Sequence, residues 1–111
     1  MIYEVLDLPA SPLAASKRFH GDDLTAIETA LSLGQAYLTL VFPAAGHEHR
    51  GWRLAAIQEL ARERAPTRVN GIEGGDSAAQ MAACDFLERA PGVTGQLLSL
   101  DSTGVDPVSS S

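Results

Sequence analysis

The chain of 111 residues alternates short apolar stretches, rich in β-branched and aromatic residues, with longer segments of helical periodicity. The apolar stretches lie at residues 2–8, 36–42, 67–72 and 94–100. Alternation of this kind is typical of a parallel sheet built from strand–helix–strand crossovers. A chain of this length supports one hydrophobic core. The sequence therefore predicts a single α/β domain over residues 1–103, followed by a flexible C-terminal tail at 104–111.

Capping residues indicate where the helices begin and end. Ser11 followed by Pro12 predicts a short helix around residues 13–15, because serine caps a helix and proline favours its first position. Asp22 and Asp23 predict the start of a second helix, which Gly34 ends.

Two further helices are predicted in the second half of the chain. One spans about residues 47–65, and the other begins after a cap at Asp76 or Ser77 and ends before Pro91. Four parallel strands in chain order, joined by right-handed crossovers, would place every helix on one face of the sheet. The other face, which carries Tyr37, Thr39 and Val41, would then be bare. Parallel sheets are normally covered on both faces, so we expect a second copy or a terminal segment to cover it, with exposure to water as the alternative.

Charge and cysteine content exclude several classes of partner. The net charge is −6, from 14 acidic and 8 basic residues, and no basic run is present. Nucleic acids and anionic membranes are therefore not expected as partners. The single cysteine excludes a disulfide within the chain and a zinc site built from cysteines. No apolar run approaches the ~20 residues that span a bilayer. We expect a cytoplasmic protein.

Residues 60–66 (LARERAP), 68–72 (RVNGI) and 86–101 resemble the C-terminal half of the short-chain dehydrogenase/reductase (SDR) family. The arginine–valine–asparagine run and the VTGQ run at residues 93–96 carry most of this resemblance. The resemblance implies a small Rossmann-like fold of two or three layers, with about four parallel strands and helices mainly on one face. It also implies an NAD(P) cofactor and a catalytic serine, tyrosine and lysine.

The family's catalytic residues have no counterpart here. The one lysine, Lys17, follows Leu13 by four positions, so the tyrosine–lysine pair is absent. By alignment on the resemblance, Gly46 occupies the family's tyrosine position and Arg50 its lysine position. Val41-Phe42-Pro43 stands where the serine is expected, and prolines replace the glycine-rich phosphate loop near the start. The sequence predicts no enzyme activity and no cofactor.

The remaining candidates for a binding site are weak. Gly74 and Gly75 precede a helix and could hold an anion, but Glu73 and Asp76 place negative charge beside them, which favours a simple turn. His47 and His49 point to different sides of a helix, and no metal site is predicted. Cys84 lies among alanines, which is typical of a buried, inert thiol.

The last question that the sequence raises is which surface binds a partner. Trp52, with Ala56 beside it, lies away from the apolar stripe of its helix, so we interpret it as an interface anchor or as a side chain packed under a loop. Tyr37, on the bare face, is a further interface candidate, and so is Leu97, on the final strand, where the resemblance implies subunit packing. We expect a non-catalytic domain that forms a homodimer or a heteromer with a related SDR subunit. The alternative is a small module that binds a nucleotide or metabolite near Gly74, at the carboxyl ends of the strands.

Overall fold

The structure, a computed structural model, describes residues 1–100; the predicted tail at 104–111 lies outside this range. All four strands are parallel and lie side by side in the order β1-β2-β3-β4, which confirms the predicted α/β fold. The strands are β1 (Ile2–Glu4), β2 (Tyr37–Phe42), β3 (Arg68–Gly74) and β4 (Leu97–Leu100). The helices are α1 (Pro12–Arg18), α2 (Leu24–Leu31), α3 (Arg50–Glu63) and α4 (Ser77–Glu88).

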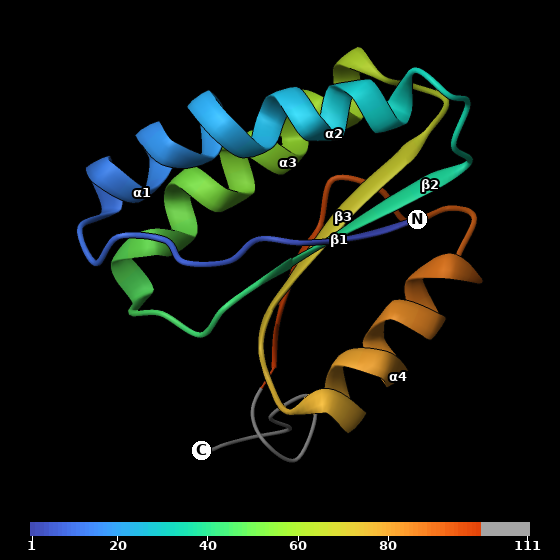
Figure 1. Cartoon of the computed structure of the whole chain (residues 1–111). Helices are drawn as coiled ribbons and strands as arrows, with labels where there is room; N and C mark the ends of the chain where they lie inside the picture. The colour runs from blue at the N-terminus through green and yellow to red at the C-terminus, as the bar shows by residue number, and fades with distance from the viewer. Residues whose placement is uncertain (101–111) are drawn as a thin grey trace.

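Helices cover both faces of the sheet. Figure 1 shows α1, α2 and α3 on one face and α4 alone on the other. Leu38, Leu40 and Phe42 of β2 pack into the core under α2 and α3, whereas Val41 and Ile72 pack against α4. The expectation that all helices share one face is wrong for α4. Since the strands follow chain order, the β3–α4–β4 crossover has the opposite hand to the two crossovers that precede it. In this position α4 covers apolar side chains of the sheet that would otherwise face water.

This placement also corrects the prediction that a second copy or a terminal segment must cover the second face. Over β3 and part of β2, α4 supplies that layer within the chain through Ala83, Cys84 and Leu87. On this face, β1 and the adjoining side of β2 border a groove that separates them from α4.

The helix ends follow local chemistry with one exception, at the start of α2. The Ser11 hydroxyl accepts a hydrogen bond from the Ala14 amide, and Gly34 ends α2 with a φ of +86°. α2 begins directly after Asp23, as predicted, but Asp22 and Asp23 lie in a π-helical turn over Phe19–Asp23 that joins α1 to α2, and the Asp23 side chain makes no capping hydrogen bond. Asp76, rather than Ser77, caps α4, and its carboxylate accepts from the Ala79 amide.

The first strand is shorter than the predicted 2–8. Beyond β1, only the amide of Val5 still bonds to β2, through the carbonyl of Val41. The backbone then turns at Asp7, which has a φ of 57°. Within residues 1–100, no helix combines the length and the apolar character that crossing a membrane requires.

Candidate functional site

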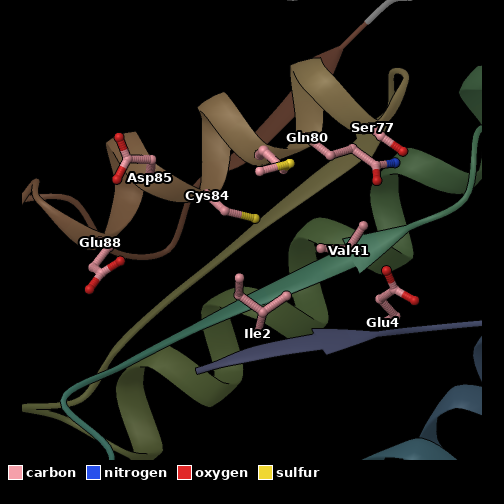
Figure 2. A pocket seen from close by; sticks show the side chains of 9 residues that line it. Ile2, Glu4, Val41, Ser77, Gln80, Cys84, Asp85 and Glu88 are labelled. Carbon is pink, nitrogen blue, oxygen red and sulfur yellow. The ribbon is translucent and has the colours of Figure 1, made fainter.

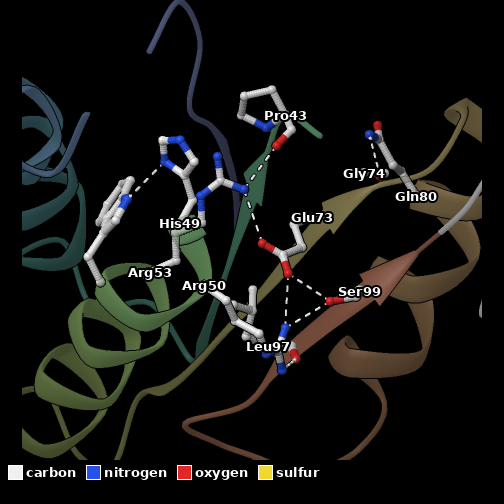
Figure 3. A network of polar contacts seen from close by, with 10 residues as sticks. Pro43, His49, Arg50, Arg53, Glu73, Gly74, Gln80, Leu97 and Ser99 are labelled. Carbon is white, nitrogen blue, oxygen red and sulfur yellow. Dashed lines mark hydrogen bonds and ion pairs between the residues drawn. The ribbon is translucent and has the colours of Figure 1, made fainter. Parts of the chain in front are cut away.

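The carboxyl ends of the four parallel strands form one edge of the sheet, where the following loops border a crevice. In open parallel sheets, ligands bind at this edge. Here a polar network occupies it (Figure 3). The network joins Arg50 and Arg53 of α3, Glu73 of β3 and Ser99 of β4.

Glu73 is the centre of this network. Nη1 of Arg50 lies 2.9 Å from one carboxylate oxygen, and the Ser99 hydroxyl donates to the same oxygen at 2.7 Å. Nη1 of Arg53 donates to the other oxygen at 3.1 Å. Arg50 also donates to the carbonyl of Leu97 at 2.8 Å. These contacts tie β3 and β4 to α3 at this end of the sheet.

Burial and hydrogen bonding oppose each other at Glu73. Burial alone would raise its pKa, but hydrogen bonds from Ser99, Arg53 and Arg50 outweigh burial and hold the pKa below the ordinary value. Arg53 is 1% exposed and lies 4.8 Å above the ring of Phe42. Because Glu73 is ionised at neutral pH and the arginines are cationic, the network fixes charges rather than transferring protons.

The two positions that the family resemblance assigned to catalysis do meet in this crevice. Gly46 precedes a 3₁₀ turn over His47–His49 that leads directly into α3, and Arg50 begins that helix. Gly46 has no side chain to offer, and the guanidinium of Arg50 is committed to Glu73, Ser99 and Leu97. The absence of catalysis stays a prediction.

Two cavities flank the network. One of about 330 Å³ lies between the loop after β1 and the loop after β2, and Arg53 and Gly46 line it. The other, of about 300 Å³, lies on the side of Arg50 and Glu73 and reaches Gly74.

His49 is buried beside the first of these cavities. Its Nε2 lies 2.9 Å from the Ala10 carbonyl, and its Nδ1 lies 3.2 Å from Nε1 of Trp52. Trp52 is a donor only, so Nδ1 accepts and Nε2 carries the proton that is donated to Ala10. Both ring nitrogens are thus used within the chain. In residues 1–100, no three histidine, cysteine, aspartate or glutamate side chains gather in a way that could hold a metal ion.

Backbone geometry explains the glycines at the predicted anion loop. Gly74 and Gly75 have φ values of +77° and +81°, which side chains rarely adopt. A Cβ on Gly74 would lie 2.8 Å from the carbonyl oxygen of Leu100. Gln80 donates to the carbonyls of both glycines. Anion binding by this loop stays a prediction.

The predicted interface residues are mostly occupied inside the chain. Trp52 packs against Phe19 at 5.5 Å between ring centroids, and Ala56 is 5% exposed in the same core. Leu97 is buried in that core as well. This corrects their assignment to an intermolecular contact, and Trp52 takes the intramolecular role that the sequence left open. The helix wheel gave no sign of it, because the neighbour of Trp52 is a distant segment, the turn at Phe19. Tyr37 is half-buried, under the guanidinium of Arg68 at 5.8 Å.

A groove that the sequence analysis missed runs between α4 and β1 (Figure 2). It has a volume of about 380 Å³. Apolar or thiol side chains line part of it, namely Ile2, Val41, Met81 and Cys84. Carboxylates line the rest, namely Glu4, Asp85 and Glu88, together with Ser77 and Gln80. Two features of the sequence could have indicated this groove: the alternation of side chains along β1, and the three-residue spacing that places Asp85 and Glu88 on one face of a helix.

Cys84 in this groove is 8% exposed, as predicted, and burial raises the pKa of its thiol.

The outer edge of β1 is open. The Met1 carbonyl and the Val5 amide bond to β2, and Tyr3 faces Leu40 in the same ladder. Because alternate residues of a strand point their backbone groups to opposite sides, those of Ile2 and Glu4 face outward. No strand in the described part of the chain pairs with them. Ile2 is 52% exposed at this edge.

A family model described as "SDR-like: Short chain dehydrogenase-like protein" matches residues 3–100. No curated protein and no solved structure matches the chain.

Proposed function

The chain belongs to the short chain dehydrogenase-like family, and we propose on that premise that it is a non-catalytic member that acts as a companion subunit. The observation that carries the proposal is the open edge of β1 beside the uncovered groove. An open edge presents unpaired backbone groups, which another chain can satisfy by adding a strand.

The crevice supports the non-catalytic part of the proposal. Where the family resemblance implies a tyrosine, Gly46 has no group that exchanges protons. Arg50 and Arg53 are held by Glu73 instead of facing a substrate. An ion network of this kind holds Arg50, Arg53 and Glu73 as fixed charges rather than as proton donors or acceptors.

The charge of the groove decides whether a second copy of this chain or a different chain occupies it. Glu4, Asp85 and Glu88 line it, and of these Asp85 has a partner in Arg89 at 2.6 Å. A second copy docked edge to edge would bring an identical set of carboxylates alongside the first. Like charges so placed repel. We therefore assign the edge to a different chain of the family, one that presents a strand edge and positively charged side chains, rather than to a second copy.

Co-expression with a full-length family member from the same genome tests this assignment. Light scattering after gel filtration is expected to show a one-to-one complex, and Glu4→Lys with Glu88→Lys is expected to weaken it at least tenfold. Glu63→Lys, an exposed charge change on α3 at the other face, is the matched control and should not matter. A stable homodimer of the wild-type chain would overturn the charge argument. Failure of every such family member to bind would overturn the companion role.

Enzyme assays test the other half of the proposal. The purified chain is expected to transfer no hydride between NAD(P)H and a panel of aldehydes and ketones. A thermal shift with NAD(H), NADP(H), flavins or common nucleotides would instead support the nucleotide-binding alternative near Gly74.

A further inference from the structure

Arg53 has donors that its neighbours do not use. Its side chain is 1% exposed, and a guanidinium carries five N–H groups. Nη1 donates to the Pro43 carbonyl at 2.9 Å and to Glu73 at 3.1 Å. Nε is buried and has no hydrogen-bond partner among residues 1–100. A buried donor without an acceptor is costly, and native structures rarely keep one.

This arginine lines the 330 Å³ cavity described above, so its guanidinium forms part of the cavity wall. Figure 3 shows its guanidinium between His49 and the end of β2 at Pro43. Apart from polar groups at one end, the lining is small and apolar: Leu8, Pro9, Ala10, Pro43, Ala44 and Ala45. Such a lining suits a short hydrocarbon chain attached to the accepting group.

Gly46 and Glu48 also line this cavity. The Glu48 carboxylate folds back over Gly46, where a Cβ would collide with it. Glu48 is exposed, so a ligand can displace it. The chain's own carboxylate thus already lies at the mouth of the cavity.

We propose that this cavity binds a small aliphatic carboxylate, whose oxygens accept hydrogen bonds from the guanidinium of Arg53. A guanidinium pairs with carboxylates and phosphates alike, and the apolar lining favours a carboxylate that carries a hydrocarbon chain. The hydrocarbon part of the ligand lies against Leu8 and Pro43. This site is independent of the β1 edge, so its failure leaves the companion role untouched.

The Arg53 Nε–H signal in ¹H–¹⁵N spectra is the direct readout. Butyrate is expected to shift this signal in a saturable manner. Butyramide, of similar shape but neutral, and inorganic phosphate at equal ionic strength are expected to leave it in place. An unmoved signal with butyrate, or an equal shift with butyramide, would overturn the proposal. A comparable shift with phosphate would show a general anion site and overturn the carboxylate assignment.

Two surface variants, Glu48→Gln and its control Glu63→Gln, test the site without changing a buried side chain. Glu48→Gln removes the competing charge and is expected to tighten butyrate binding about threefold, as removal of one exposed like charge allows. Glu63→Gln removes a charge elsewhere and should not alter the affinity. Unchanged affinity in Glu48→Gln would contradict the location of the site. Arg53→Lys should abolish binding where it folds, and the wild-type signal decides the matter where it does not.

Discussion

Replacing Glu73 by glutamine removes the charge at the centre of the crevice network while keeping its shape. The Arg53 side chain, 1% exposed, would then stay buried without a counter-ion. Removing one partner of a buried pair costs ~3–5 kcal/mol. Glu73 is 16% exposed and Arg53 keeps the Pro43 carbonyl, so we expect the lower end, about 3 kcal/mol. The partly exposed pair with Arg50 adds little.

Urea denaturation followed by circular dichroism measures this loss at pH 7. A loss of about 3 kcal/mol corresponds to a fall of about 12 °C in the melting temperature of a domain near 100 residues. The matched control is Glu59→Gln, whose pair with Arg62 at 2.9 Å is about two-thirds exposed. That control is expected to change stability by less than about 0.5 kcal/mol.

The pH dependence gives the same argument a second test. Because the folded-state pKa of Glu73 lies below its ordinary value of 4.5, its contribution is fully present above pH 4.5. It is lost as the pH falls through the folded-state pKa. The difference between wild type and Glu73→Gln should therefore be largest at neutral pH and shrink in acid. The double variant Glu73→Gln with Arg53→Met no longer contains the buried charge. Its loss of unfolding free energy should therefore be smaller than the sum of the losses in the two single variants.

A cost below about 1 kcal/mol for Glu73→Gln, or a difference that stays constant down to pH 3, would refute this reasoning.

Three further predictions follow from local geometry. Burial is the main cause and a hydrogen bond to Asp23 at 2.8 Å the second cause that raise the pKa of Tyr3 to about 12, so ultraviolet titration should show its ionisation well above pH 10. The stabilising contribution of Tyr3 is present below pH 10 and is lost as the pH rises through 12. Tyr3→Phe should lower the free energy of unfolding by about 1 kcal/mol at pH 7. Gly74→Ala should destabilise the fold by about 2 kcal/mol in urea titrations, because of its positive φ and the Leu100 carbonyl, whereas Gly92→Ala, with open space around it, should change stability by less than about 1 kcal/mol. Burial raises the pKa of the Cys84 thiol, so a disulfide reagent at pH 8 should label it slowly in the native chain and rapidly in urea; fast native labelling would show that α4 does not cover it.

Much of the fold was predictable because it depends on local chemistry. The alternation of apolar stretches with helical periodicity predicted four parallel strands, and the structure has them in chain order. Ser11 and Gly34 act at helix ends through bonds and dihedral angles that involve only their near neighbours. The resemblance assigned Gly46 and Arg50 to the family's catalytic positions, and both line the cavity that reaches Gly74.

The candidate sites were less predictable because their parts are far apart in the chain. Arg53 and Glu73 are twenty residues apart and meet only when α3 lies over β3. Trp52 was assigned to an interface because the wheel of one helix does not show the segment around Phe19 that covers it. The groove beside β1 needs α4 as its other wall.

The sequence by itself determined the elements, their order and most of their ends, since propensity, capping and the period of apolar residues operate within a few positions. Only the tertiary structure decided on which face α4 lies, and hence that β1 keeps an open edge and that Arg53 is buried beside a cavity. The physical reason is that the side on which a crossover passes depends on the apolar area that it covers on distant strands, and no local pattern records that area.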